Sequence, residues 1–398
     1  MTVNEQRQQK GERPYTFGFI LNTTVGNMTR YQNLRKYAER DRDVECRWAP
    51  VSHYTPPDFP SRLRFLPEPL FMRARVLQQA WPVLGRLGDL DAVMVHLFEA
   101  DVLCSLRSYV DRRLVHVSST DEAPIVDRST YPLYPHELAK PLWRQKLRLA
   151  LDRWRVRRTD QFIPFSDWVA NILVDGCGAP APNVHPLHVG LDLDIWRPRP
   201  RPERPADSRF RILFVGGDFV RKGGDLLLEV FRTRFQDSAE LHLVSRQAPK
   251  ELPPHVHVHA DFHPNDERLT ELYAQVDLLV VPTVADISPW VFLEAMAMGL
   301  PVIGTDIGAI REFIHQGETG FVIGVGDGEA LGTAIETLQR EPDTRRRMGH
   351  AGRALVESEY SASRNVPRIL ATMKRAVDAR RPAIPAGSSS GRAGRGVP

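Results

Sequence analysis

Short apolar runs alternate with longer amphipathic stretches along most of this 398-residue chain. Apolar runs of about four to eight residues are typical of strands, and apolar residues spaced three and four apart are typical of helices. Strands that alternate with helices form parallel sheets covered by helices on both faces. We therefore predict an α/β fold.

The alternation falls into two series, one before residue 198 and one after residue 205. In the first series we expect strands at 15–21, 92–97, 113–117, 161–165 and 185–188, and helices near 29–40, 71–87, 136–158 and 167–175. In the second we expect strands at 211–215, 240–244, 255–259, 277–281, 301–303 and 320–323, and helices near 224–235, 266–275, 289–299, 329–340 and 343–358.

A proline-rich segment, PRPRPERP at 198–205, separates the two series. Alternating prolines hold a chain in an extended, semi-rigid conformation, so we place the domain boundary there. The predicted parts are a first domain at 14–197, a second at 206–360, a further helix at 361–381, and disordered tails at 1–13 and 382–398. Two open α/β sheets joined in this way bind ligands in a cleft at the carboxyl ends of their strands.

Composition narrows the class of protein. No run of about 18 apolar residues occurs and no secretory segment opens the chain, so we expect a soluble or at most peripheral protein. The three cysteines lack a C-x-x-C spacing, which argues for a reducing cytoplasm and against a zinc site. The isoelectric point of about 9.0 fits an anionic partner, although a mildly basic surface without function explains it equally well.

The segment DISPWVFLEAM places Asp286 and Glu294 eight residues apart around the start of a predicted helix. Ser288 can cap this helix, and Pro289 suits its first position because no amide hydrogen is needed there. The free amides and partial positive charge of a helix N-terminus attract phosphate. A carboxylate further in, such as Glu294, can accept hydrogen bonds from the hydroxyls of a sugar. The pattern predicts a sugar-nucleotide site.

A glycine-rich loop follows the first strand of the second domain. Gly216, Gly217, Gly223 and Gly224 allow tight turns and close approach of a phosphate, and the same loop contains the basic pair Arg221-Lys222. Neither the dinucleotide pattern G-x-G-x-x-G nor the P-loop pattern occurs here. The alternative, a solvent-exposed basic loop, loses weight because the two carboxylates follow some sixty residues later.

These motifs resemble the retaining GT-B glycosyltransferases of family four, also called group 1. The resemblance extends over nearly all of residues 15–380 and includes PFSDWVANIL at 164–173 and LHVGLDLDIWRP at 187–198. It implies two Rossmann-like domains with parallel sheets facing a central cleft, and a C-terminal helix that crosses back to the first domain. It also implies transfer of a hexosyl group from a nucleotide-diphosphate sugar with retention. No Asp-x-Asp metal site stands out in the sequence, so we expect neither a metal nor another cofactor.

The resemblance assigns roles to residues of the second domain. Arg221 and Lys222 would hold the donor diphosphate, Glu294 the ribose and Asp286 the transferred sugar, at a position where glutamate is usual. Glu312 matches an acidic residue in a turn that faces the donor pocket, although a solvated helix residue is the alternative.

Two departures from the family pattern affect the phosphate contacts. Ser288-Pro289 stands where many relatives have Phe-Gly, and proline has no amide hydrogen. The amides of Trp290 and Val291, or the Ser288 hydroxyl, would then contact the distal phosphate. Gly217 stands where arginine is common, so Arg221 would supply that charge.

The first domain contains fewer recognisable motifs. Gly26-Asn27 follows the first strand and resembles the glycine loop that approaches the donor sugar and phosphate; a plain Gly-Asn turn is the alternative. Asp121, followed by Glu122, ends an apolar strand and is our candidate for acceptor positioning or proton uptake. His96 also ends a strand at the cleft, whereas the pattern around His116 favours a buried structural histidine.

The segment from Lys140 to Arg158 predicts a basic helix with an apolar stripe. It contains eight Lys or Arg residues and one acidic residue, and Trp143, Leu147, Leu151 and Trp154 fall on one face. Such a helix suits an anionic membrane surface. The alternative is a helix that packs its tryptophans into the domain core. Nucleic acid is not favoured, because no recognised binding motif accompanies the charge.

We therefore expect a metal-independent hexosyltransferase in which Asp286, Lys222, Arg221 and Asp121 act in catalysis. Its donor would be a nucleotide-diphosphate sugar and its acceptor a glycan, a lipid-linked sugar or a small molecule. A nucleotide-sugar epimerase or hydrolase on the same fold, and a non-catalytic nucleotide-sugar-binding protein, are the alternatives. The residues do not name the base, the sugar or the acceptor.

Overall fold

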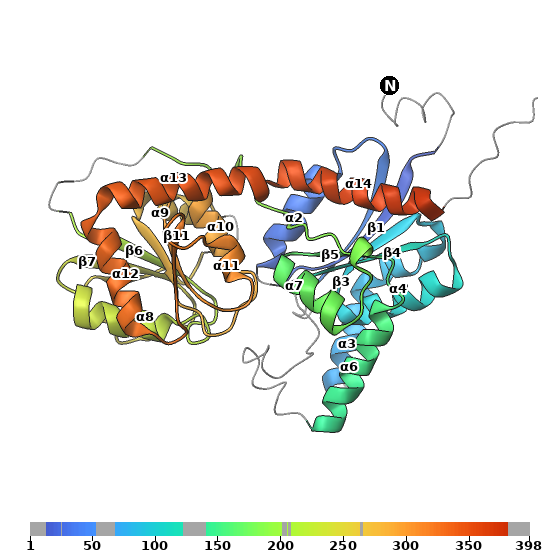
Figure 1. The fold of residues 1–398 in the computed structure, drawn as a ribbon, viewed down its shortest axis with the longest axis horizontal. Helices are drawn as coiled ribbons and strands as arrows, with labels where there is room; N and C mark the ends of the chain where they lie inside the picture. Colours follow the sequence, from blue (N-terminus) through green and yellow to red (C-terminus); the bar gives the residue numbers. More distant parts are fainter. Residues whose placement is uncertain are drawn as a thin grey trace, which may run out of the picture.

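The computed structural model of the chain describes residues 13–24, 26–52, 68–121, 141–200, 205, 208–262 and 266–380. Figure 1 shows two α/β halves joined along one side by two consecutive helices, α13 and α14. The tails predicted at 1–13 and 382–398, apart from Arg13, lie outside the described residues, as do the middle of the linker (201–204) and the positions Glu122 and Lys140.

The first domain is built on a parallel sheet of five strands in the order β2-β1-β3-β4-β5. Its strands are β1 (Tyr15–Asn22), β2 (Val44–Val51), β3 (Ala92–His96), β4 (Val115–Thr120) and β5 (Gln161–Pro164). Its helices are α2 (Asn27–Ala38), α3 (Glu68–Leu84), α4 (Phe98–Val110), α6 (Leu142–Val156) and α7 (Asp167–Asn171).

The second domain contains a six-stranded parallel sheet in the order β11-β10-β9-β6-β7-β8. Its strands are β6 (Phe210–Val215), β7 (Ala239–Val244), β8 (Val256–Val258), β9 (Leu278–Val281), β10 (Val302–Thr305) and β11 (Gly320–Ile323). Its helices are α8 (Gly224–Val230), α9 (Glu267–Gln275), α10 (Trp290–Ala297), α11 (Ile310–Phe313), α12 (Gly328–Arg340) and α13 (Pro342–Glu359). The predicted α/β class is therefore confirmed.

Burial explains which elements the apolar pattern revealed. Every residue of β9, LLVV, is buried, so the strand stands out as a continuous apolar run. Strand β2 was not predicted, because it lies at the sheet edge and several of its side chains are at least partly exposed. Helix α4 was also not predicted. The strand predicted at 185–188 is wrong. The amides of His185 and Leu187 donate to carbonyls of β5, but Pro164 of β5 has no amide hydrogen with which to return a bond.

The final helix, α14 (Ala362–Arg380), crosses back to the first domain as expected. The Tyr15 hydroxyl donates to Asp378, at 2.9 and 2.8 Å from its two carboxylate oxygens. Lys374 donates to Asp41 at 2.8 Å, and Arg380 forms an ion pair with Asp160. These contacts fasten the end of the described chain to the first domain.

The chain crosses between the domains at a close backbone contact. Leu191 and Ser361 form an isolated parallel bridge, in which the Leu191 amide donates to the Tyr360 carbonyl at 2.7 Å. Gly190 precedes it with a φ of +85°, and a Cβ atom there would lie 2.8 Å from the Ala362 nitrogen and still closer to the Tyr360 carbonyl oxygen. Only glycine combines this backbone conformation with this approach.

Gly190→Ala is expected to lower the free energy of unfolding by more than about 2 kcal/mol, because a left-handed backbone and a steric clash both penalise the new methyl group. Gly178→Ala is the matched control: its φ is +76°, but nothing lies within 4 Å of the added Cβ. The control should lose only about 1 kcal/mol. Denaturant unfolding measures both, and equal losses would show that the backbone contact does not stabilise the crossing.

Candidate active site

The glycine-rich loop brings Lys222 to Asp286. The Lys222 ammonium donates to the Asp286 carboxylate, and both side chains are 15% exposed. Gly223 makes the turn possible: its φ is +77°, and a Cβ atom there would collide with the carbonyl of Pro282. The basic pair and the first predicted carboxylate, which lie 64 positions apart in the chain, therefore form one cluster.

Arg221 is held against the segment that carries Asp286. Its guanidinium donates to Asp218 at 3.2 Å and to the carbonyl oxygen of Ala285 at 2.5 Å. A Cβ atom at Gly216 would lie 2.9 Å from the Lys222 side chain, whereas nothing lies within 4 Å of one at Gly217. A side chain at Gly217, such as the arginine that the resemblance expects there, would thus find open space.

Helix α10 begins one residue later than predicted. Its first residue is Trp290 and Pro289 is its N-cap, without a side-chain hydrogen bond. The prediction that Ser288 caps the helix is therefore wrong. The Ser288 hydroxyl is buried and has no hydrogen-bond partner in the described part of the chain. The amides of Trp290 and Val291 begin the helix, where no intrahelical acceptor is available, so they can donate to an anion.

Glu294 lies inside the domain, 8% exposed, on the same helix. The hydroxyl of Tyr273 in α9 donates to its carboxylate at 3.1 Å. Burial raises the pKa of Glu294 to about 7, and the hydrogen bond from Tyr273 offsets this only in part. The carboxylate is thus held at a fixed position at an energetic cost.

Glu312 makes contacts that the sequence did not predict. Its carboxylate accepts hydrogen bonds from the amides of Asp167 and Trp168, at 2.8 and 2.6 Å. These amides begin α7 of the first domain, so Glu312 forms a contact between the domains. Burial raises its pKa, and the two amides oppose that shift. In this structure the Glu312 carboxylate is bound to these amides and is not available to a sugar-nucleotide donor.

His188 lies at the centre of an aromatic contact between the domains that sequence reasoning missed. Its ring centroid is 4.6 Å from that of Trp290, and it also packs against Phe165, Phe313 and Tyr360. The Gly190 amide donates to its Nδ1, and burial lowers the pKa of His188 to about 3, so the ring is neutral. A Cβ atom at Gly26 would lie 3.8 Å from Trp290, which places the predicted glycine loop beside the start of α10.

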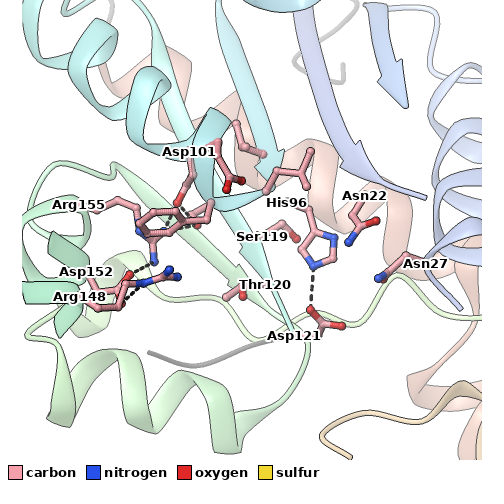
Figure 2. A pocket seen from close by; sticks show the side chains of 15 residues that line it. Asn22, Asn27, His96, Asp101, Ser119, Thr120, Asp121, Arg148, Asp152 and Arg155 are labelled. Atoms are coloured by element: carbon pink, nitrogen blue, oxygen red, sulfur yellow. Dashed lines mark hydrogen bonds and ion pairs between the residues drawn. The ribbon is translucent and has the colours of Figure 1, made fainter. Parts of the chain in front are cut away.

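A cavity of about 250 Å³ lies in the first domain (Figure 2). It is lined by Asn22, Asn27, Val95, His96, Leu97, Phe98, Glu99, Asp101, Ser118, Ser119, Thr120, Asp121, Arg148, Asp152 and Arg155. Three of these, Asn27, His96 and Asp121, were singled out from the sequence because they follow strand ends. The residues from α6 were interpreted as part of a basic surface helix and not as cavity residues, because helical periodicity does not show which strand ends a helix will meet.

The His96 ring donates through Nε2 to the Asp121 carboxylate at 2.8 Å. Burial lowers the pKa of His96, so the ring is neutral. Burial alone would raise the pKa of Asp121, but His96 and Arg30 outweigh it and the pKa is lowered. Asp121 is therefore ionised, and its remaining lone pairs can accept a hydroxyl. His116 is fully buried against Asp101 at 2.7 Å, which confirms its structural role.

Helix α6 contributes an ion-pair network to the wall of the cavity. Arg155 donates to Asp101 and to Ser118 and forms a longer ion pair with Asp152. Arg148 donates to Asp152 at 3.1 Å, and its guanidinium lies 3.7 Å from the ring centre of Phe98. The polar face of α6 thus points into the cavity.

Among the described residues, no group of three or more His, Cys, Asp or Glu is placed to hold a metal ion. No helix in the same residues is long and apolar enough to cross a membrane.

Comparisons with known proteins agree with this geometry. Residues 209–341 match the family described as "Glycosyl transferases group 1". That range contains both carboxylates and the basic pair. It forms a group 1 glycosyltransferase domain. The described chain has the GT-B fold: the sucrose-phosphate synthase of Thermosynechococcus elongatus superposes with a TM-score of 0.72 at 16% identity, over 92% of this chain and 100% of that one.

Curated relatives resemble parts of the chain. The N-acetyl-alpha-D-glucosaminyl L-malate synthase of Bacillus anthracis is 31% identical over 28% of this chain and 29% of its own length. The MMP alpha-(1->4)-mannosyltransferase of Mycolicibacterium hassiacum is 27% identical over 52% of each chain. The chain therefore spans about half or less of the length of these relatives, and the similarity reaches family level, not the level of a particular substrate.

Glu294→Gln in the group 1 domain should weaken nucleotide-diphosphate binding by about 1.5–3 kcal/mol, through loss of a charge-assisted hydrogen bond. It should also stabilise the fold at alkaline pH. The folded carboxyl has a pKa near 7 and an ordinary one 4.5, so the folded state binds the extra proton between these values. Stability is therefore complete below the lower value and falls as the pH rises through the higher one.

The variant should gain up to about 3 kcal/mol over the wild type at pH 8 and less than about 1 kcal/mol at pH 5. Calorimetry with a free nucleoside diphosphate and unfolding at the two pH values measure the two effects. Glu229→Gln, an exposed position on α8, is the control. Unchanged nucleotide affinity would contradict the ribose assignment.

Proposed function

We propose that this protein is a metal-independent hexosyltransferase that transfers a sugar from a nucleotide-diphosphate donor to an acceptor in the first-domain cavity, with retention of configuration. The main support is the Lys222–Asp286 pair, which lies beside the start of α10 in a group 1 glycosyltransferase domain. In this pair Lys222 supplies a cation for the leaving phosphate, and Asp286 supplies a carboxylate that can bind the transferred sugar.

In the proposed reaction the bond between the anomeric carbon and the distal phosphate oxygen breaks, and its electron pair stays on the phosphate. Lys222, Arg221 and the amides of Trp290 and Val291 stabilise that charge, as preorganised donors do at developing anions. The acceptor oxygen bonds to the anomeric carbon. Its proton passes to the leaving phosphate or to Asp121.

We assign the remaining contacts to the sugar-nucleotide donor from the positions of the residues around the Lys222–Asp286 pair. Gly26 and Asn27 approach the transferred sugar from the first domain, and Gly216 and Gly217 leave room for the phosphates. Glu294 binds the ribose of the nucleotide. We do not assign Glu312 to the donor, because its carboxylate is bound to the amides of α7.

The cavity favours transfer over the alternatives. An epimerase or hydrolase acts on the nucleotide sugar without an acceptor, and a binding protein needs no ionised Asp121 at a strand end. Analysis of the products of a labelled donor separates the three: a glycosylated acceptor, an epimerised or hydrolysed sugar, or unchanged donor.

Lys222→Ala should reduce turnover about 100-fold, because the ammonium meets charge that grows in the transition state. Asp286→Asn should weaken binding of the nucleotide sugar but not of the free nucleoside diphosphate, since Asp286 contacts the sugar. Lys250→Ala, at an exposed position of the same domain, is the control. Calorimetry with both ligands decides the second claim, and equal losses for both ligands would show the role of Asp286 to be wrong.

We further propose that the protein works in the cytoplasm at the inner face of an anionic membrane, docked through α6. The packing alternative required the apolar stripe of α6 to enter the core, but the stripe remains largely outside it. Trp143 and Leu147 are each 62% exposed, whereas the buried positions of α6 are Asp152, Arg155 and Val156. Figure 1 shows the helix extending away from the sheet of the first domain.

Neighbouring helices also carry exposed apolar side chains, and α4 packs against both α3 and α6. The large exposed apolar side chains of the three helices are Leu70, Trp81, Leu103, Leu106, Tyr109, Val110, Leu142, Trp143, Leu147 and Leu151. In the described part of the second domain, by contrast, the exposed large apolar side chains are four valines. An apolar surface with tryptophans and many arginines suits the interface of an anionic bilayer.

Replacing the exposed residues Arg144, Lys146, Arg153 and Arg157 with glutamine should release the protein from vesicles that contain anionic lipid. Each such charge contributes about 1 kcal/mol near the surface, and salt screens it. Arg148 and Arg155 stay unchanged because both line the cavity. The matched control removes four exposed charges from the second domain: Lys250, Arg340, Arg346 and Arg347.

Co-sedimentation over a series of salt concentrations measures the binding. Equal binding to neutral and anionic vesicles, or equal loss in the control, would exclude docking through α6.

A further inference from the structure

Arg30 is a buried cation without a carboxylate in hydrogen-bond contact among the described residues. It stands in the first turn of α2, just after the Gly26-Asn27 loop, and is 1% exposed. Its Nη2 donates to Ser119 Oγ at 2.6 Å, while Nε and Nη1 have no hydrogen-bond partner in the described part. Burying a charge in this way is costly unless another charge compensates it.

The contacts of Arg30 lead to the cavity. Its guanidinium lies 4.1 Å from the ring centre of Phe165, and that ring packs against His96 with centroids 5.5 Å apart. His96 in turn donates to Asp121 at 2.8 Å. Ser119, His96 and Asp121 all line the cavity, so Arg30 lies behind the part of its wall that carries the His96–Asp121 pair.

The pKa shifts also connect Arg30 with the His96–Asp121 pair. Burial lowers the pKa of Arg30 to about 9, and the attraction of Asp121 opposes this shift, so the guanidinium stays protonated at neutral pH. Burial is the largest cause of the lowered pKa of His96 and of His188, and the charge of Arg30 is the second cause. The same charge helps to lower the pKa of Asp121.

We propose that Arg30 is a positioning residue whose buried charge keeps Asp121 ionised and His96 neutral. It acts from behind the cavity wall and does not touch the acceptor. A neutral His96 donates its single Nε2 hydrogen to Asp121, and the ionised carboxylate keeps its other lone pairs for an acceptor hydroxyl. This inference rests on the proposed function, which assigns that hydroxyl to Asp121.

The alternative is that Arg30 only packs against Phe165. The two roles differ in what they do to His96. A packing role leaves the titration of His96 unchanged when the charge is removed and the shape is kept. A positioning role makes that titration depend on the charge.

The test is an NMR titration of the histidine rings in the full chain. The His96 signal is assigned by its loss in His96→Asn. In Arg30→Met the midpoint of His96 should rise by about one pH unit, because a nearby cation no longer opposes protonation. Arg30→Lys should restore the wild-type midpoint. Arg35→Met, an exposed position on the same helix, is the matched control and should change nothing.

A double-mutant cycle gives a second measurement that does not depend on the folding of Arg30→Met alone. Asp121→Asn should lower the melting temperature by leaving the buried Arg30 uncompensated. Adding Arg30→Met to it should recover part of that loss, as coupled charges require. Additive losses, or an unchanged His96 midpoint in folded Arg30→Met, would overturn the proposal.

Failure of the proposed function can be recognised separately. A chain that binds no nucleoside diphosphate in calorimetry contradicts the glycosyltransferase assignment, while the histidine titration still reports on Arg30. A chain that binds nucleotide and shows an unchanged His96 midpoint contradicts only the role of Arg30.

Discussion

The return of the chain from the second domain to the first determines how the two halves of the site face each other. The bridge between Leu191 and Ser361 brings α14 onto the first domain, where Lys374 and Asp378 fasten it. With this connection in place, Glu312 reaches the amides that begin α7. The start of α10 and the glycine loop of the first domain then lie beside each other, as a reaction between ligands of the two domains requires.

The parts of the site that could be predicted are those encoded by neighbours in sequence. Lys222 follows a glycine turn after a strand, and Asp286 and Glu294 have a fixed spacing around one helix start. His96 and Asp121 end apolar strands, so the rule for parallel sheets places them at the cavity. Strand ends and helix starts are local features, and short segments reveal them.

Tertiary contacts determined what the sequence patterns could not show. Glu312 was read as a donor residue because its place in the motif was recognisable, but the amides it binds belong to a distant segment of the first domain. His188 was invisible because its aromatic partners come from both domains. The apolar stripe of α6 was identified correctly, yet periodicity gives the side of a helix that is apolar and not whether a core or solvent meets it.

Helix α6 links the proposed membrane surface to the cavity. Trp143 and Leu147 are exposed on its outer part, whereas Arg148 and Arg155 reach the cavity wall further along the same helix. A rigid helix of 15 residues therefore fixes the position of the cavity relative to any surface that its outer part contacts. If that surface is a bilayer, an acceptor with a lipid anchor presents its head group at a set depth, and the ion pairs of Asp152 with both arginines hold that geometry. Docking and acceptor positioning would then depend on the same element.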